Sequence, residues 1–269
     1  MFKEKVLLGQ YYPTASPVHR LHASGKLIVV FLYMAALFVV NSWLGWGVLT
    51  GVCLLTVLLS RVPLRALWRG LKLILIFALL TVVINAFFYG GEHVLWQWRS
   101  LCLTTEGISW GLAMGLRLLL LVAFASLLTL TTTPIALTDG LEDLLSPLRR
   151  LHVPAHEIAM MMSIALRFIP MILEEFDRLL LAQRARGANI GGRGRLDKRL
   201  LSFVPLLVPL FVAALRRAED LAQAMEAKCY QGGEGRTRWK LQPWRFCDTL
   251  TLMLFCLLLA AAIAQRIWL

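Results

Sequence analysis

Several motifs that indicate catalysis or metal binding are missing from this 269-residue sequence. It has no G-x-x-x-x-G-K-[ST] phosphate-binding loop, so the chain is not expected to hydrolyse ATP by itself. It also has no H-E-x-x-H motif of the kind that holds a catalytic zinc ion. The five cysteines include no C-x-x-C pair, and an odd, scattered set argues against a disulfide framework or a zinc site.

Acidic residues are also scarce. The chain has 16 Asp and Glu against 28 Lys and Arg, which gives a formal net charge of +12. Hydrophobic residues make up 58% of it and the mean hydropathy is +0.69, whereas soluble domains are nearer half apolar. Because charge is costly in hydrocarbon, the composition indicates a membrane protein whose basic residues lie outside the bilayer. The N-terminal segment lacks an apolar core of signal-peptide length, so no cleaved signal is predicted.

Five apolar runs approach or reach the roughly 17–25 residues that a membrane-spanning helix needs. They are residues 27–40, 43–59, 71–89, 111–130 and 250–269. The first two predict a helical hairpin with Asn41 and Ser42 at its tip. Basic residues in short loops favour the cytoplasm, which places the N-terminus inside and the Asn41–Ser42 turn outside. By the same rule the segment with Arg61, Arg65 and Arg69 lies inside, and the nearly uncharged loop that follows the third span lies outside.

Residues 131–248 hold 17 of the 28 basic residues and two further apolar stretches, residues 158–173 and 200–215. If both stretches crossed the bilayer, the basic residues between them would lie outside, against the charge rule. We therefore predict long amphipathic helices on the cytoplasmic side. Pro170, Pro205 and Pro209 predict kinks or breaks in these helices.

The sequence thus predicts an all-α integral membrane protein with about five transmembrane helices and a cytoplasmic coupling domain of long amphipathic helices. No strand pattern competes with this interpretation. The predicted division is a membrane part with four spans at residues 1–130, the cytoplasmic domain at residues 131–248, and a C-terminal transmembrane helix at residues 249–269.

Small residues recur at four-residue spacing in two of the predicted spans. They are Gly107, Gly111 and Gly115 in one span, and Gly47 and Gly51 in another. This spacing lets helix backbones approach closely, either within the chain or against another membrane protein. Arg117 lies inside the fourth span. An intramembrane charge is a functional candidate, and the alternative is a structural pair, for which Asn85 is a candidate partner.

Two groups of side chains resemble weak metal sites. Asp139 and Asp143 flank Glu142, but acids here also suit the first turn of a helix, where they offset the helix dipole. His152 and His156 are four residues apart, but the intervening Pro154 argues against one regular helical face. No metal site is predicted from either group.

Two similar segments carry the most specific signal. LAQRARGANI spans residues 181–190, and LAQAMEAKCY spans residues 221–230. Each places a basic residue after an alanine at a predicted helix end. A terminal cation and a glycine cap explain the first copy alone. Two such ends, each following an apolar helix, indicate contacts with a partner that offers acidic groups.

These segments belong to a wider resemblance. The tracts GQYYPTASPVHRLHASGKL, TTTPIALTDGLEDLLSPLRRLHVP, SIALRFIPMILEEFDRLLLAQRARGA, VPLLVPLF and AMEAKCYQGGEGRTR cover most of the chain. Through them the sequence resembles the transmembrane T component of energy-coupling factor transporters. The resemblance implies a non-catalytic subunit in the cell membrane that couples a pair of ABC-type ATPases to a small membrane S component. The implied function is uptake of a vitamin or other micronutrient.

The resemblance also implies site residues. In the family, the arginines of two Ala-Arg-Gly motifs insert into a groove on each ATPase. Carried over, the ATPase-binding residues are Ala185, Arg186 and Gly187, and Ala227, Lys228 and Cys229. In the second motif Lys228 keeps the charge but lacks the fork geometry of a guanidinium. Cys229 is a poor left-handed cap, so we expect Gly232 or Gly233 to end that helix slightly later. ATP and Mg would be bound by the ATPases, with no cofactor on this chain and no nucleic acid as partner.

We further expect the S component to dock on adaptable apolar faces and on the glycine repeats. The expected docking residues are Met160, Met161, Met162, Leu206, Leu207, Val208, Leu210, Phe211, Val212, Gly107, Gly111 and Gly115. One alternative is a membrane-embedded lipid- or prenyl-modifying enzyme that uses Asp139, Asp143 and the basic loop around Arg193 to hold a diphosphate. That chemistry would need a second acidic motif facing the first. A structural scaffold unrelated to transport is another alternative.

Overall fold

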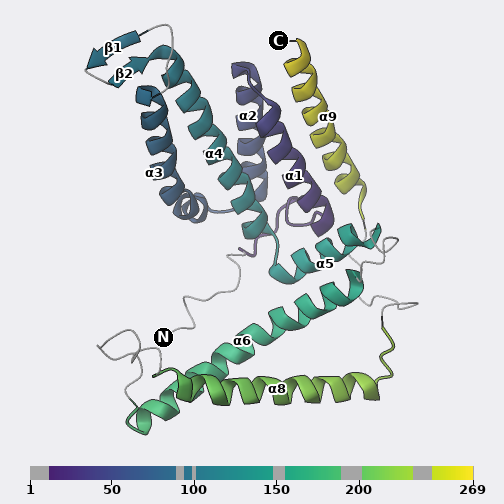
Figure 1. Ribbon diagram of the computed structural model, residues 1–269. Coiled ribbons are helices and arrows are strands. Elements are labelled where there is room, and N and C mark those ends of the chain that lie inside the picture. Colours follow the sequence, from purple (N-terminus) through teal and green to yellow (C-terminus); the bar gives the residue numbers. More distant parts are fainter. Residues whose placement is uncertain are drawn as a thin grey trace. The chain divides into compact units, whose positions relative to one another are not determined.

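The structure, a computed structural model, describes residues 12–88, 94–98, 101–147, 155–188, 202–232 and 244–268. The chain divides into two compact units. The membrane unit comprises residues 8–144 and 241–269, and the helix-pair unit comprises residues 1–7 and 145–240. The predicted all-α class is confirmed, because the described residues are overwhelmingly helical (Figure 1).

The helices of the membrane unit are α1 (Ala23–Val39), α2 (Trp43–Ser60), α3 (Leu64–Phe88), α4 (Thr105–Thr131), α5 (Pro134–Leu145) and α9 (Phe246–Trp268). Four of them, α2, α3, α4 and α9, are long and apolar enough to cross a membrane, and α1 is a shorter apolar helix. The five predicted spans coincide with these helices. Hydropathy predicted the apolar parts of these helices but not their ends. For example, α3 begins at Leu64 and includes the charged Arg65 and Arg69, whereas the predicted apolar run begins at residue 71.

Three aromatic side chains form the centre of the membrane unit. Tyr33 of α1 stacks on Phe124 of α4 with ring centroids 4.0 Å apart, and Phe255 of α9 meets Tyr33 edge-on at 6.3 Å. The hydroxyl of Tyr33 donates a hydrogen bond to the carbonyl of Leu49 in α2 at 3.1 Å. This residue therefore joins four helices, and a buried Tyr needs such a polar partner. The most extensive packing of α1 is against α9, not against its predicted hairpin partner α2.

The glycine repeat of α4 packs within the chain. A Cβ added at Gly107 would lie 2.7 Å from the carbonyl oxygen of Asn85, and one at Gly111 would lie 2.9 Å from that of Val82. At Gly115 it would lie 2.9 Å from a methyl group of Val82. Only glycine allows α3 and α4 this close. The structure therefore supports the prediction that these glycines pack against another helix of the same chain.

One end of the membrane unit is tied together by polar groups. The ammonium of Lys26 donates to the carbonyls of His19 and Thr131, at 3.3 and 3.1 Å, and to the hydroxyl of Thr132 at 3.2 Å. The carboxylate of Asp248 accepts from two backbone N–H groups, those of His22 and Arg245, both at 2.8 Å. These contacts join the start of α1 to the end of α4 and the start of α9.

The segment before α1 folds over the same end. His19 hydrogen-bonds through its two ring nitrogens to the hydroxyl of Ser16 at 2.6 Å and to the carbonyl of Tyr12 at 3.1 Å. Burial lowers the pKa of His19 below its usual value, the hydrogen bond to Tyr12 opposes that shift, and the charge of Lys26 adds to it. The imidazole is therefore neutral at neutral pH and holds this segment in place as a hydrogen-bonding group.

Helix α5 belongs to the same end of the membrane unit. It begins at Pro134, and the hydroxyl of Thr133 accepts from the N–H of Ala136 at 3.2 Å as an N-terminal cap. A Cβ at Gly140 would lie 2.8 Å from the backbone nitrogen of Ser24, so α5 packs closely on the start of α1. The sequence-based division at residue 131 assigned this helix to the cytoplasmic domain, whereas its packing places it with the spans.

A short antiparallel hairpin lies between α3 and α4. It pairs β1 (Val94–Trp98) with β2 (Leu101–Thr104). From the sequence this stretch was expected to be a loop, because strands of four or five residues give almost no periodic signal. The hydroxyl of Thr104 then accepts from the N–H of Gly107 at 3.1 Å and caps α4.

The helix-pair unit contains α6 (Ala155–Ala185) and α8 (Val204–Ala227), which pack on each other. Arg217 of α8 and Glu175 of α6 form an ion pair at 3.5 Å. Both helices continue through their internal prolines, Pro170 and Pro209, so no break occurs there. Pro205 instead lies in the first turn of α8, where a missing N–H costs nothing. By length and composition α6 is also long and apolar enough to cross a membrane.

Candidate functional site

The end of α6 has the geometry of a Schellman cap. The N–H of Gly187 donates to the carbonyl of Arg184 at 3.0 Å, and the N–H of Ala188 donates to that of Gln183 at 3.0 Å. Gly187 has φ +82°, the left-handed conformation that this motif requires. Its predicted role as a helix cap is confirmed. Arg186 precedes it, exposed at the negative end of the helix dipole.

The end of α8 repeats this geometry at the equivalent residues. The N–H of Cys229 donates to the carbonyl of Glu226 at 2.8 Å, and that of Tyr230 donates to the carbonyl of Met225 at 3.0 Å. Cys229 itself has φ +54°. The expectation that the helix would continue toward Gly232 or Gly233 is therefore wrong. The hydrogen bonds of the cap outweigh the steric cost of a left-handed cysteine, which is roughly 1–2 kcal/mol.

Arg186 and Lys228 thus occupy the same position in two equivalent helix ends. Each is the last residue before the left-handed turn, and each side chain is exposed. Among the described residues neither has an ion-pair partner. The arrangement leaves two separate cations, each projecting from a helix C-terminus, that are able to bind acidic groups of another protein.

The expected apolar docking face divides into exposed and buried residues. Met161 and Phe211 are 59% and 67% exposed. Met162, Leu207, Val208 and Val212 are also exposed, whereas Met160 and Leu210 are half-buried. Leu206 is fully buried and cannot form part of an open surface. Each of the two helices therefore leaves large apolar side chains exposed, as is typical of contact sites for another protein or a membrane.

The three glycines of the expected docking set, all in α4, differ from the two spaced glycines of α2. Gly107, Gly111 and Gly115 are covered by α3 and are not available to a partner. Gly47 and Gly51 of α2, whose spacing predicted close packing within the chain or against another membrane protein, have nothing within 4 Å of an added Cβ. The open small-residue surface of the membrane unit is therefore on α2, not on α4.

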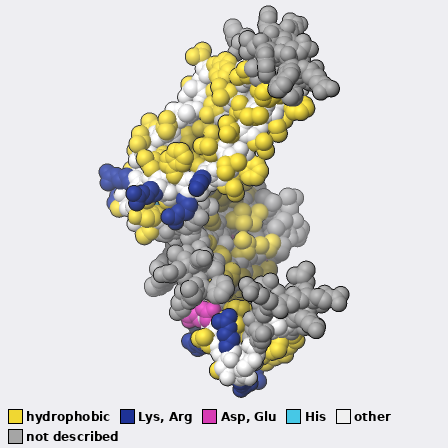
Figure 2. Space-filling view, turned by 90° about the vertical axis from the view of Figure 1, so that its left-hand side faces the viewer, with side chains coloured by type: hydrophobic (Ala, Val, Ile, Leu, Met, Phe, Trp, Pro, Cys, Tyr) yellow, Lys and Arg dark blue, Asp and Glu magenta, His cyan; other side chains and the backbone are white. Residues whose placement is uncertain are grey.

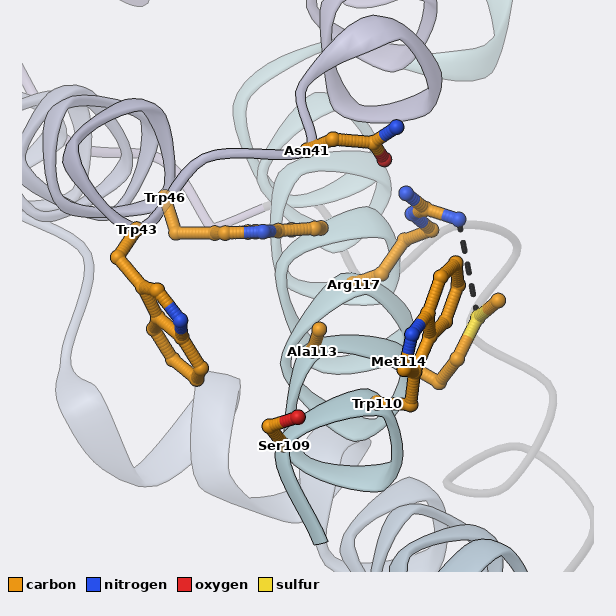
Figure 3. Close-up of a pocket in the computed structure, with 8 residues that line it drawn as sticks. All are labelled: Asn41, Trp43, Trp46, Ser109, Trp110, Ala113, Met114 and Arg117. Carbon is orange, nitrogen blue, oxygen red and sulfur yellow. Dashed lines mark hydrogen bonds between the residues drawn. The ribbon is translucent and has the colours of Figure 1, made fainter. Parts of the chain in front are cut away.

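Arg117 lies beside a cavity of about 270 Å³ at the α1–α2 turn (Figure 3). Its guanidinium carbon is 5.2 Å from the ring centroid of Trp46 and 5.5 Å from that of Phe38, distances typical of cation–π contacts. One terminal nitrogen donates to the carbonyl of Val40 at 3.5 Å, and the other contacts the sulfur of Met114 at 3.7 Å. Arg117 therefore holds the turn after α1 against α4. This contact supports the prediction of a structural role for Arg117.

Asn85 is not the partner of Arg117. Its side-chain amide donates to the carbonyl of Thr81, one turn earlier in α3, at 2.9 Å. The partners of Arg117 are instead the rings of Phe38 and Trp46 and the carbonyl of Val40. No spacing rule in the sequence connects these groups to Arg117. The cavity beside Arg117 is lined by three tryptophans of α2 and α4, namely Trp43, Trp46 and Trp110.

The segment Gly107–Gly111 (GISWG) matches the G-x-S-x-G pattern of serine hydrolases. That motif requires a sharp strand-to-helix turn that exposes the serine. Here the five residues lie inside α4, and the hydroxyl of Ser109 donates to the carbonyl of Glu106 in the same helix at 2.9 Å. The context for a nucleophile is absent from this segment.

Of the two weak metal candidates, only the acidic group lies wholly within the described residues. Asp139, Glu142 and Asp143 lie along α5, and Asp143 is 3.8 Å from His22 Nε2. Across the described ranges no three metal-ligating side chains gather around one point. His152 and Arg193 lie outside the described residues.

Comparison with known proteins finds relatives that match most of the chain. The family model CbiQ, described as a cobalt transport protein, matches residues 14–239. The energy-coupling factor transporter transmembrane protein EcfT of Acidaminococcus fermentans is 48% identical over 257 residues, covering 94% of this chain and 95% of its own. The EcfT proteins of Thermanaerovibrio acidaminovorans and Clostridium kluyveri are 51% and 43% identical, covering 91% and 98% of this chain and 89% and 97% of their own.

The family is a membrane subunit of transporters and not a catalytic enzyme. Together with the apolar helices, these relatives show that this chain is a multi-pass membrane protein. The chain belongs to the EcfT family, the transmembrane components of energy-coupling factor transporters.

Proposed function

We propose that this chain couples two ABC-type ATPases, which bind ATP and Mg, to one small membrane S component that binds a vitamin or other micronutrient. The observation that carries the proposal is the pair of equivalent helix ends. Two identical backbone caps, each presenting one exposed cation, suit two similar partner surfaces better than one. The chain itself supplies no catalytic group and binds no cofactor in this scheme.

The ATPase contacts are assigned to Ala185, Arg186 and Gly187 at the end of α6, and to Ala227, Lys228 and Cys229 at the end of α8. The capped ends are rigid, because the last carbonyls of each helix are satisfied by the turn. A displacement of an ATPase groove would therefore move the whole helix rather than only its end. The ion pair of Arg217 with Glu175 links the two helices, so movement of one would be passed to the other.

The S component is assigned to the exposed apolar side chains of the helix-pair unit. They are Met161, Met162, Leu207, Val208, Phe211 and Val212, with Met160 and Leu210 at their margin. Methionine adapts to partners of different shape, which suits a surface that must hold an S component in two orientations. Leu206 supports this surface from below instead of contacting the partner.

The proposed orientation places the N-terminus and the helix-pair unit in the cytoplasm. The exposed Arg61, Arg65 and Arg69 lie around the junction of α2 and α3, at one end of the spans. Figure 2 shows Lys and Arg side chains gathered at one end of a largely hydrophobic face of the membrane unit. Basic residues in short loops are retained on the cytoplasmic side. The Asn41–Ser42 turn and the β1–β2 hairpin then lie outside.

Gentle-detergent purification of the full chain, with identification of the chains that accompany it, tests this proposal. Two ATPases that carry phosphate-binding loops and one small hydrophobic protein are expected. The double variant Arg186→Ala/Lys228→Ala should lose the ATPases and keep the small protein. The variant Met161→Ser/Phe211→Ser should do the reverse. Loss of neither partner in either variant would refute the assignment of the two surfaces.

A further inference from the structure

An apolar groove of about 920 Å³ runs along the membrane unit. Its walls are α2, with Gly51 and Leu55, and α9, with Leu250 and Leu254. Its floor is formed by α1 and α4. Helix α9 packs on α1, and helix α2 packs on α4. Leu55 and Leu254 remain 58% and 53% exposed, so the two walls do not close over the floor.

The groove is wide beside Gly51. A Cβ there would meet nothing within 4 Å, so this wall is bare helix backbone. The depth of the groove is fixed by Phe124 and Phe255, which line it and pack against each other at 5.9 Å as part of the aromatic centre. A long, smooth, apolar trough of this kind fits a hydrocarbon chain, which needs no hydrogen-bond partners along its length.

Basic side chains gather at one end of the groove. Its lining includes Arg20, Arg61 and Arg245, together with Lys26 and Asp248. Lys26 and Asp248 are buried and already hydrogen-bonded to backbone groups. The three arginines are exposed, and none has an ion-pair partner among the described residues. Arg20 lies before α1, Arg61 follows α2 and Arg245 precedes α9, so the three residues line the same end of the groove.

We propose that this groove binds an anionic phospholipid, with its phosphate at the three arginines and an acyl chain along α2 and α9. Guanidinium groups match phosphate oxygens with paired hydrogen bonds. Basic pockets between transmembrane helices recognise anionic head groups in this way. The rival occupant is a transmembrane helix of a partner protein. Its end on this side of the bilayer would itself tend to be basic, and the three arginines would repel it.

Native mass spectrometry of the full chain, purified with the subunits that accompany it, tests the head-group contact. The protein is incubated with phosphatidylglycerol or with phosphatidylcholine of the same acyl chains. The wild type is expected to retain phosphatidylglycerol selectively. The variant Arg20→Gln/Arg61→Gln/Arg245→Gln is expected to bind it about tenfold more weakly or worse, because each basic residue near an anionic head group contributes to affinity.

A matched control removes the same charge from the same end of the membrane unit but outside the groove. Arg65, Arg69 and Lys72 are exposed on α3 and do not line it. The variant Arg65→Gln/Arg69→Gln/Lys72→Gln should keep wild-type selectivity. An equal loss in this control, or no preference for phosphatidylglycerol in the wild type, would mean that only diffuse surface charge is involved, and the proposal would fail.

The acyl-chain contact has its own pair of variants. Gly51 lines the groove and Gly47, one turn earlier, does not, although both have open space beside them. Gly51→Leu should fill the trough and displace lipid, whereas Gly47→Leu should leave lipid retention unchanged. Photo-crosslinking from Leu254 provides a second readout. A crosslink to lipid supports the proposal, and a crosslink to a small membrane protein would overturn it.

Discussion

Cys229 has the same left-handed backbone conformation as Gly187, at φ +54° and +82° respectively, and each residue closes the C-terminus of a long helix with the same pair of hydrogen bonds. The two helix ends are therefore equivalent in backbone although their sequences differ at the capping position. Any asymmetry between them arises from side chains. Cysteine at this position carries strain that glycine does not, and lysine lacks the guanidinium fork.

Cys229→Gly is expected to stabilise the end of α8. Relief of the left-handed strain should contribute about 0.5–1 kcal/mol after the greater freedom of glycine in the unfolded chain is subtracted. Hydrogen exchange at the amides of residues 229 and 230, which donate the cap hydrogen bonds, should slow by several-fold. Gly187→Cys is the reciprocal variant and should accelerate exchange at residues 187 and 188. Unchanged exchange in both variants would show that the caps do not bear strain.

Arg186→Ala is expected to reduce ATP-driven uptake more than Lys228→Ala. Truncating a desolvated, hydrogen-bonded charge at an interface costs about 2–5 kcal/mol, and the loss is greatest where the charge forms two parallel bonds. Transport by reconstituted vesicles, normalised to the amount of assembled complex, measures the difference. Equal or reversed losses would contradict the assignment of the stronger contact to Arg186.

Lys228→Arg should retain or increase the coupling of ATP hydrolysis to transport. Because the backbone at the end of α8 already matches that of α6, an arginine placed there starts from the geometry of Arg186. The ratio of substrate transported to ATP hydrolysed is the appropriate measurement. A clear fall in that ratio would mean that the second partner surface is adapted to a point charge.

Gly111→Ala is expected to destabilise the membrane unit. The added methyl group would lie 2.9 Å from the carbonyl oxygen of Val82 and 3.1 Å from its Cα, so α3 and α4 would have to separate. Overpacking of this kind costs about 1–3 kcal/mol. The matched control is Gly47→Ala, where the methyl group meets open space. Thermal unfolding in detergent should show a lower midpoint for Gly111→Ala alone.

Hydropathy and charge were sufficient to predict the spans, because a bilayer imposes its own length and polarity on a helix. The ends of the helices were less predictable. Residues 64–71 of α3 include Arg65 and Arg69, and these charges excluded the segment from the predicted apolar run although it is helical. The β1–β2 hairpin was missed because so few residues give no usable alternation.

The site residues were predictable where local chemistry determined them. Gly187 was assigned as a cap from its position after Arg186, and the structure agrees. Cys229 was misjudged because sequence rules rank single residues, whereas a complete pair of cap hydrogen bonds can hold a residue in a conformation that it disfavours. The partners of Arg117 could not be found at all, since Phe38, Val40 and Trp46 reach it only through the packing of three helices.

The contact between Tyr33 of α1 and Phe255 of α9 joins the first described helix to the last described one. At about 5–20 residues per second, a ribosome needs roughly 10–40 s to proceed from α1 to α9. Throughout that time the principal packing face of α1 has no partner, and both helices of the helix-pair unit are synthesised before α9. A nascent chain of this protein is thus able to meet its partners before its own membrane unit has closed, and a truncation before Phe246 would leave an inserted but unfinished bundle.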